Sequence, residues 1–531
     1  MEFFLSRKIV IILFLVTFFL IQIIPFFIWL NRTQLHVAFD ESVHLMIALD
    51  SYNKIFHHND ITSQQLQYIY SSYTYSKNRY PHLFHWSTLP FFYFFGVSPK
   101  SAVLVNVVYF LILLVSGYFI GKKLSSKKAG LLIAFLLSSL PMYVLLLKYY
   151  LIDLSLVSII ALTTALLFYS QNFRKTPFAF FAGVTFGLGL LTKQPFILYI
   201  SIIPLGFFAT GLCTQIKSKR INRTFFLNLF LFVLPIIIIA GTWYFKYFGL
   251  VKIYYKDFLF GGVAEGNALI TQPQSYLFYF WSILFGFGFW YLINFILASY
   301  LIFKNKKSQY YLYILNIVFI YLAVSLIFTK DPRYIAPALL FLTIVTVVGL
   351  ELIKNKKISN VIFALLIIIG FIQLHLSMLL VDKYSFYAQN ERFTSVAESI
   401  KTEQPVGDFS IEKVLKLIQA QDADKKEYST ICLAIQTLHI ENNNVAYFTF
   451  QNDYSFASVD AYSCDPLLYD YVISGPIYKY IPYSDSVEKI KNILYDNIEK
   501  FELVGSVQIY KEHSINVYKN KIEKEARKKI N

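Results

Sequence analysis

The stretch Phe39-Asp40-Glu41-Ser42-Val43-His44 holds two adjacent carboxylates and an imidazole just beyond a long apolar run at 9–30. Ionisable side chains beside a membrane span are expensive unless they face water and serve a function. Carboxylates and imidazoles accept protons and bind metal ions. Asp40, Glu41 and His44 are usable metal ligands, but their spacing is not diagnostic. The sequence therefore leaves open whether a divalent metal ion binds here, and it predicts no other cofactor.

Each of these residues also has a structural interpretation. An aspartate at the position of Asp40 caps a following helix by accepting backbone N–H groups. Glu41 fits the solvated face of that helix equally well, and a lone histidine such as His44 is more often structural. Residues 41–56 are predicted to form an amphipathic helix along the membrane interface, with one apolar side formed by Val43, Ile47, Tyr52 and Ile55 or Phe56.

Membrane spans must position these residues. Of the 531 residues, 56% are hydrophobic and 15% are charged, and an ordinary soluble domain has roughly 25% charged residues. The first apolar run is too long for a signal-peptide core, so it is predicted to be a retained span. The sequence predicts a polytopic α-helical membrane protein with about 11 spans, at 9–30, 101–121, 129–147, 154–170, 177–192, 195–212, 225–248, 276–303, 309–328, 334–352 and 358–380.

Basic residues indicate the orientation of the spans. With Arg7 and Lys8 in the cytoplasm, every second connection is a compact basic cluster, as the positive-inside rule requires. An odd number of spans then places the C-terminal region outside a plasma membrane. The Lys/Ile/Asn-rich composition favours a prokaryotic plasma membrane. The clusters contain Lys122, Lys123, Lys127 and Lys128; Arg174 and Lys175; Lys217, Lys219, Arg220 and Arg223; Lys304, Lys306 and Lys307; and Lys354, Lys356 and Lys357.

The net charge of +16 belongs to the membrane half, because residues 1–380 hold 30 Lys/Arg against 10 Asp/Glu and residues 381–531 hold 18 against 22. Nucleic-acid binding is therefore not supported. Apart from Glu2 and Glu351, the acidic residues of the membrane half all fall on the outer side. This pattern predicts a site at the outer face, and the residues are Asp40, Glu41, Asp50, Asp60, Asp153, Asp257, Glu265 and Asp331.

Two domains are predicted, a membrane domain at 1–380 and a soluble extracytoplasmic α/β domain at 381–531. The first outer loop, 31–100, carries the predicted active site. A second outer loop, 249–275, has glycines that fit either a mobile lid or plain turns. The α/β domain has helical stretches at about 409–421 and 484–500, and β-rich runs at Ser429–Ile435, Val445–Phe450, Tyr469–Ser474, Val504–Tyr510 and Ile515–Tyr518.

Cys432 and Cys464 lie in the C-terminal domain. Outside the cytoplasm they are able to form a disulfide. Two unpaired buried thiols are the alternative.

Several motifs follow one another along the membrane half. The Asp40-Glu41 pair comes first, then a Tyr80-Pro81 return, the lone Asp153, the run Gly187–Lys193, and Arg333-Tyr334 at the start of a late span. In this order they resemble the GT-C superfamily of membrane glycosyltransferases. The branch concerned contains protein O-mannosyltransferases and lipid A aminoarabinose transferases. The resemblance covers residues 9–350, although His82 stands where the family often has a second proline.

The resemblance implies a sugar transfer from a polyprenyl-phosphate-linked donor at the outer face, usually with inversion. Such a reaction needs a base for the acceptor's hydroxyl proton and cations for the departing phosphate. By its match to the family's first-loop aspartate, Asp40 is the expected base, with Glu41 and His44 as possible supports. Asp153 is the second choice for a catalytic or acceptor-orienting role, and an ion pair with Lys148 is its simpler alternative.

Five cations are candidates for the phosphate, with Lys193 and Arg333 first by motif position. Each alone fits a snorkelling interfacial charge, but together they are able to form an anion site. Tyr80 is included as a substrate-binding candidate because it belongs to the return motif. The remaining cations are Arg79, Lys148 and Lys330.

The predicted function is therefore an integral membrane glycosyltransferase of the cell envelope. Its partners would be the lipid bilayer, a polyprenyl-phosphate sugar and a lipid, glycan or protein acceptor. A polymerase or ligase of lipid-linked glycans is the first alternative. A lipid-linked solute transporter comes third, since span interiors are nearly free of the charges that a transport path requires.

Overall fold

The computed structural model describes residues 7–32, 39–56, 80–218, 223–260, 269–379, 411–422, 429–436, 442–452, 454, 456–459, 464–477, 484–508 and 514–523. The chain divides into two compact units, each described by itself. The first unit contains α1 (Arg7–Arg32), the return segment Tyr80–Phe84 and the helices from α6 to α20. The second contains α2 (Phe39–Phe56), most of α4 (Leu83–Phe95), α5 (Pro99–Val103) and the C-terminal sheet with its helices.

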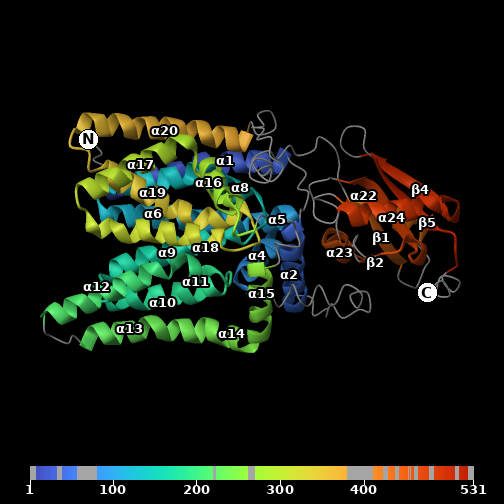
Figure 1. Ribbon diagram of the computed structural model, residues 1–531, viewed down its shortest axis with the longest axis horizontal. Helices are drawn as coiled ribbons and strands as arrows, with labels where there is room; N and C mark the ends of the chain where they lie inside the picture. The colour runs from blue at the N-terminus through green and yellow to red at the C-terminus, as the bar shows by residue number, and fades with distance from the viewer. Residues whose placement is uncertain are drawn as a thin grey trace. The chain divides into compact units, whose positions relative to one another are not determined.

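The first unit is a helix bundle (Figure 1). Its helices after α1 are α6 (Val105–Leu124), α7 (Lys127–Ser139), α8 (Pro141–Lys148), α9 (Asp153–Ser170), α10 (Thr176–Leu190), α11 (Phe196–Ile200), α12 (Ile202–Ser218), α13 (Arg223–Ile236), α14 (Thr242–Lys246), α15 (Phe248–Phe260), α16 (Pro273–Phe287), α17 (Phe289–Lys304), α18 (Tyr311–Ser325), α19 (Ala336–Leu350) and α20 (Lys356–Leu379). A short 3₁₀ turn, η4 (Pro332–Ile335), precedes α19.

Six helices among the described residues are long and apolar enough to cross a membrane, or up to eight if the bent pairs α7–α8 and α16–α17 each count as one span. The chain is thus a multi-pass membrane protein. Each of the eleven predicted runs falls on a helix or on consecutive helices, but several of these helices are too short to count as spans. The number eleven stays a prediction.

The run at 276–303 is not one straight span, because α16 and α17 meet at an angle of 106°. Gly288 stands at the break with φ of 100°, and a Cβ there would lie 2.0 Å from Nε2 of Gln373. The positive φ favours glycine, and a Cβ would also require the Gln373 side chain to move. The sequence did not reveal the break because apolar residues continue across it.

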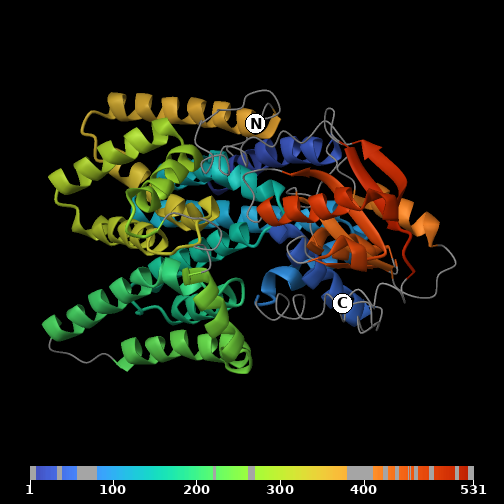
Figure 2. The ribbon, with the colours of Figure 1, turned by 45° about the vertical axis from the view of Figure 1, so that its right-hand side comes forward.

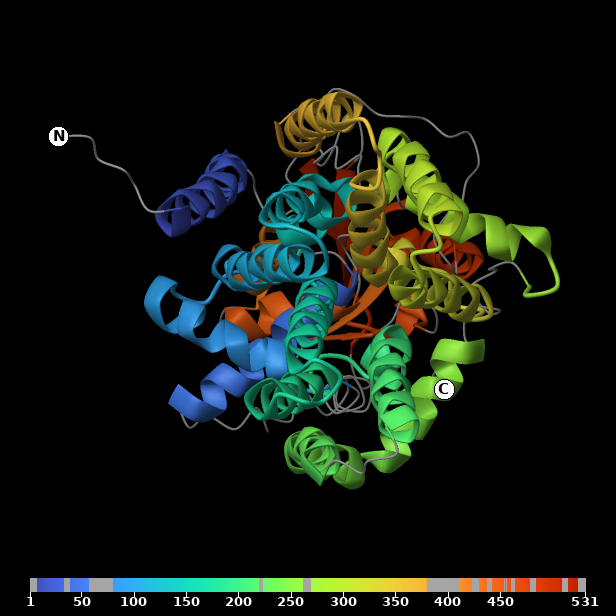
Figure 3. The same ribbon diagram turned by 90° about the vertical axis from the view of Figure 1, so that its left-hand side faces the viewer.

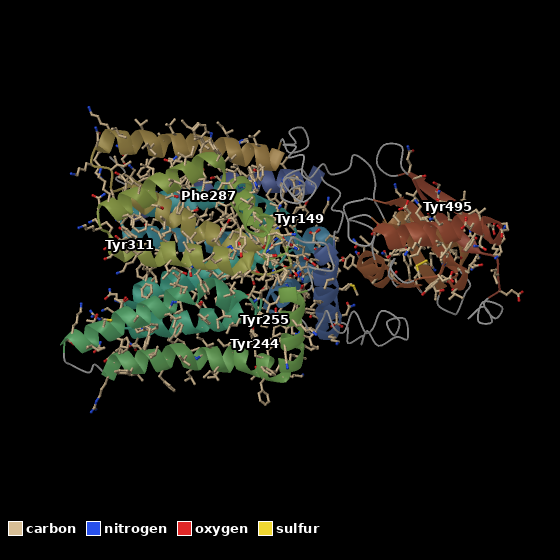
Figure 4. All side chains as sticks on the ribbon, viewed as in Figure 1. Tyr149, Tyr244, Tyr255, Phe287, Tyr311 and Tyr495 are labelled. Atoms are coloured by element: carbon tan, nitrogen blue, oxygen red, sulfur yellow. A yellow bond between two sulfur atoms is a disulfide. The ribbon has the colours of Figure 1, made fainter. Side chains whose placement is uncertain are left out.

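The basic connections meet at one end of the bundle. Lys128 donates to Oδ1 of Asn360 at 2.6 Å, Ser126 donates to Oε1 of Glu351 at 2.7 Å, and Tyr310 donates to the Leu124 carbonyl at 3.3 Å. These bonds join the α6–α7, α17–α18 and α19–α20 connections. Figure 3 views the bundle from this end. In Figure 4, Tyr311 lies toward this basic end, whereas Tyr149 and Tyr255 lie at the opposite end.

The second unit contains a five-stranded sheet in the order β2-β1-β3-β5-β4 (Figure 2). β1 is parallel to β2 and β3, and β5 is antiparallel to β3 and β4. The strands are β1 (Ser429–Gln436), β2 (Phe456–Val459), β3 (Tyr471–Ile477), β4 (Phe501–Gln508) and β5 (Ser514–Asn520); the helices are α22 (Ile411–Gln421), α23 (Asn442–Gln451) and α24 (Ser484–Asp496).

Four of the five β-rich runs form strands, but the prediction for Val445–Phe450 is wrong. These residues belong to helix α23. Parallel neighbours such as β1 and β2 need a crossover connection, which is usually a helix, and α23 provides it. The β-branched and aromatic residues that favour a strand instead pack this helix against the core, where Val445 and Tyr447 are fully buried.

Helix α2 starts two residues before its predicted range and is buried more widely than a surface helix. Every residue from His44 to Asp50 is buried. Within the second unit α2 contacts α23, and the rings of Tyr52 and of Phe92 on α4 are perpendicular, with their centres 5.8 Å apart. The predicted one-sided interfacial helix is therefore replaced by a packed one, and α2 belongs to the same compact unit as the C-terminal sheet.

Cys432 of β1 and Cys464 form a disulfide with a Cα–Cα distance of 5.7 Å. The bond closes a loop of 32 residues in sequence, which in the chain-entropy account stabilises the fold by on the order of 3–4 kcal/mol. Of the two alternatives open at the sequence level, the structure has the paired form.

Candidate active site

Asp153 is the first residue of α9, at the end of the bundle opposite the basic connections. The preceding turn is held by Asn106 of α6, whose amide donates to the Tyr149 carbonyl at 2.6 Å. A carboxylate in the first turn of a helix is stabilised by the helix dipole. The side chain of Asp153 is only 4% exposed, so it needs charged or hydrogen-bonding partners.

Lys193 provides one partner. Its Nζ lies 2.8 Å from Oδ1 of Asp153 and 5.3 Å from the ring centre of Tyr334. Lys193 follows α10, whose last turn requires a glycine, because a Cβ on Gly189 would lie 2.2 Å from the ring of Phe196. The Gly187–Lys193 run thus positions a cation. Gly189 leaves room for the Phe196 ring, and the turn after α10 brings the Lys193 amine to Asp153.

Arg333 provides the second partner, with Nη1 3.9 Å from Oδ2 of Asp153. Asp331 holds this guanidinium from the other side. Its carboxylate accepts from Nε of Arg333 at 2.8 and 2.9 Å, pairs with Nη2, and accepts from the Arg333 backbone N–H at 2.8 Å. Asp331 therefore caps η4 and orients the arginine at the same time.

We call Asp153, Lys193, Asp331 and Arg333 the charged cluster. It contains two cations and two carboxylates, so its four side chains are balanced in formal charge. A buried charge that loses its partner destabilises a fold strongly, which explains why each cation has a carboxylate beside it. An anion placed here would meet two positioned cations, one of them the bidentate donor Arg333.

Tyr80 lies beside the charged cluster, packed with Tyr255, Ile327 and Tyr334. Its segment is tied to the end of α10 by the bond from the Leu83 N–H to the Leu191 carbonyl at 3.1 Å. Tyr255 of α15 donates to the Gln194 carbonyl at 3.1 Å. The tyrosines thus form an aromatic wall next to Lys193 and Arg333. Arg79 lies outside the described residues.

Lys330 and Lys148 have partners of a structural kind. The amine of Lys330 donates to the carbonyls of Ser325, at 2.7 Å, and of Ile327, at the C-terminal end of α18. Burial lowers the pKa of Lys330 to about 8. Lys148 donates to the Ser377 carbonyl at 2.7 Å and lies 5.2 Å from the ring centre of Trp29. Both side chains thus donate hydrogen bonds to backbone carbonyls near the C-terminal ends of helices.

Asp40 and Glu41 occupy the first turn of α2, in the second unit. Glu41 is buried and Asp40 is half-buried. His44, one turn later, is buried, and its Nδ1 lies 3.1 Å from Nε2 of His85 on α4. Within the described ranges, no group of three or more His, Cys, Asp or Glu is arranged to hold a metal ion.

Two residues of this geometry were not among the sequence candidates. Asp331 was noted as an outer carboxylate, and its spacing of two residues before Arg333, across a proline, was the available signal for an arginine-orienting cap. His85 had no such signal, because its partner His44 is 41 residues away in sequence.

Residues 79–245, which contain Asp153 and Lys193, match the family of dolichyl-phosphate-mannose-protein mannosyltransferases. No curated protein matches the chain in sequence. Among solved structures, ArnT from Cupriavidus metallidurans bound to undecaprenyl phosphate is similar, with a TM-score of 0.60 and 13% identity over 94% of this chain and 97% of that chain. Its apo state has a TM-score of 0.57 at the same identity and coverage.

The chain has the fold of a GT-C membrane glycosyltransferase. The expected resemblance is confirmed. With 94% of the chain covered, the likeness extends beyond the motifs at 9–350 into the C-terminal region. Its low identity means that the GT-C likeness concerns the fold, and the roles of individual residues depend on the geometry above.

Proposed function

We propose that this GT-C protein is a glycosyltransferase that moves a sugar from a polyprenyl-phosphate-linked donor to a hydroxyl acceptor at the outer membrane face. The convergence of Lys193 and Arg333 on Asp153 carries the proposal. Two positioned cations at one end of the helix bundle are able to stabilise the negative charge of a departing phosphate. The matched family's dolichyl-phosphate-mannose and the undecaprenyl phosphate bound by ArnT support this donor class.

In the proposed reaction the acceptor's hydroxyl oxygen attacks the anomeric carbon of the sugar. The bond between that carbon and the phosphate oxygen breaks, and both electrons leave with the polyprenyl phosphate. The hydroxyl proton passes to a carboxylate, for which we propose Asp40. Lys193 and Arg333 stabilise the negative charge that grows on the phosphate. Glu41 and His44 would support Asp40 from the same helix.

Asp153 is better suited to positioning than to accepting the proton. Its carboxylate is buried and already bonded to the Lys193 amine at 2.8 Å, so one of its oxygens is already occupied by a partner within the protein. We therefore assign it the task of holding Lys193 and Arg333 in place, and Asp331 the same task for Arg333. Tyr80 would line the donor site, and Arg79 and Lys148 would contribute positive charge near it.

Asp40→Asn tests the proposal. Asparagine keeps the shape and the capping ability of aspartate but cannot act as a base. The measurement is donor consumption by the purified protein in lipid, with a panel of polyprenyl-phosphate sugars. We expect wild type to consume one donor. The variant should fold, bind that donor and lose turnover by about 100-fold or more.

Each other outcome has a clear meaning. Full turnover by Asp40→Asn would make Asp40 a structural residue of the first turn of α2 and leave Asp153 as the base to test. Growth of a lipid-linked glycan chain during the assay would favour the polymerase or ligase alternative. If wild type consumes no donor in the panel, the transferase proposal fails and lipid-linked solute transport becomes the next hypothesis.

A further inference from the structure

One face of the C-terminal sheet is covered over only part of its width. Helix α24 packs over β1 and β3 on this face, where its Ile490 and Leu494 join Val472 in a buried cluster. In the register of the sheet, Tyr518 of β5 pairs with Val472 and also with Leu503 of β4. Directly paired residues point to the same face, so Tyr518 and Leu503 continue the face beyond α24.

This continuation is open to solvent. Leu503 is 55% exposed and Tyr495, on the flank of α24, is 46% exposed. Ser506 is exposed and Asn516 is half-buried, and these two are paired across β4 and β5. We call Tyr495, Leu503, Ser506, Asn516 and Tyr518 the open sheet face. The other helix over these strands, α22, packs against the opposite side, where the core cluster with Val517 lies.

The polar groups of the open sheet face are hydroxyls and an amide, and they form a network. Ser506 donates to Oδ1 of Asn516 at 2.8 Å. Tyr518 shares a hydrogen bond with Asn516 and has Tyr495 as a neighbour. The Tyr495 hydroxyl lies 3.4 Å from Oγ of Ser474. The open sheet face contains no acidic or basic residue type, although the chain as a whole carries +16.

We propose that the open sheet face binds an uncharged glycan. A sugar ring presents apolar C–H surface on its faces and hydroxyls around its edge. The exposed ring of Tyr495 and the side chain of Leu503 match the apolar surface, and the Ser506–Asn516–Tyr518 network offers donors and acceptors to the hydroxyls. Use of this face for acceptor recognition rests on the proposed function; glycan binding itself does not.

The composition of the face disfavours other occupants. An acidic polysaccharide or a nucleic acid would require exposed cations. The nearest lysine on α24, Lys491, has its amine committed to the Gly475 carbonyl at 2.9 Å. A protein partner or a second copy would require a desolvated apolar centre, and here one leucine and one tyrosine provide the exposed apolar surface.

Glycan binding by the full-length protein in lipid nanodiscs tests the inference. The probes are neutral hexasaccharides of glucose, mannose and galactose, with a hexasaccharide of galacturonic acid as the charged counterpart. Saturation-transfer NMR reports binding. We expect wild type to bind a neutral probe with a Kd in the millimolar range or below. Tyr495→Ala should weaken binding by about tenfold or more, and Tyr495→Phe, which keeps the ring, by about threefold or less.

Ile493→Ala is the matched control, because Ile493 is an exposed apolar residue of the same helix at a position turned away from Tyr495. It should bind like wild type. The inference is overturned if no neutral probe binds at about 10 mM, if only the charged probe binds, if Tyr495→Ala binds as wild type does, or if the face proves to join two copies in one nanodisc. Donor consumption without acceptor should be unchanged in Tyr495→Ala, so a failed donor assay and a failed glycan assay are distinguishable.

Discussion

The two ends of the helix bundle carry charge in different ways. At the basic end, Lys122, Lys123 and Lys127 are exposed, as expected of residues that orient spans. At the opposite end the side chains of Lys193 and Asp153 are 9% and 4% exposed and bonded to each other. Lysines thus serve two purposes in this protein. The exposed lysines orient the spans, whereas Lys193 is buried beside a carboxylate that fixes its position.

The sharpest test of this difference is Lys193→Met, which keeps much of the side-chain length and removes the charge. Loss of one positioned cation should lower donor turnover by about 100-fold or more. Steady-state donor consumption in nanodiscs measures it, with thermal unfolding as the control for folding. Turnover within a few-fold of wild type would place Lys193 among the structural charges.

Asp153→Asn separates positioning from base catalysis. If Asp153 positions Lys193, the variant should lose turnover by about tenfold and bind polyprenyl phosphate more tightly, since one negative charge is gone. In the double variant with Lys193→Met the two losses should be less than additive, because both changes act through Lys193, while Asp153 also contacts Arg333. Abolished turnover with unchanged affinity for polyprenyl phosphate would instead make Asp153 the base.

Lys330 gives a smaller effect that depends on pH. Its pKa is lowered to about 8 in the folded protein by burial, whereas the unfolded chain has a lysine pKa of roughly 10.4. Between these values the unfolded state binds more protons, so the contribution of Lys330 to stability rises with pH from about 8 to about 10. The thermal midpoint of wild type should therefore rise relative to Lys330→Met as pH increases across this window. Parallel curves would contradict the burial of the amine.

The smallest effect is expected at the basic end. Lys122→Gln with Lys123→Gln should change donor turnover by less than about twofold, because both amines are exposed and exposed charges contribute little to local structure. Insertion in the original orientation, checked by protease accessibility, is the control. A large loss of turnover in a correctly inserted variant would remove the distinction between the two ends.

Three members of the charged cluster could be singled out from the sequence because their signals are local. The run Gly187–Lys193 and the pair Arg333-Tyr334 are short motifs, and the structure brings Lys193, Arg333 and Asp153 together. Most helices and strands after residue 409 were likewise predicted from hydrophobic periodicity. The helix at 442–451 was not, since its residues favour strand locally and only the parallel pairing of β1 and β2 calls for a helix there.

The sequence by itself determined the membrane class, the basic connections, most helices and strands, and the residue types available for chemistry. These properties depend on composition and on periods of a few residues. Only the tertiary structure decided that Asp331 orients Arg333, that His44 contacts His85, that Gly288 breaks a continuous apolar run and that Cys432 pairs with Cys464. Such pairings depend on which helix and strand ends meet in space, and hydrophobic patterning along the chain does not record that.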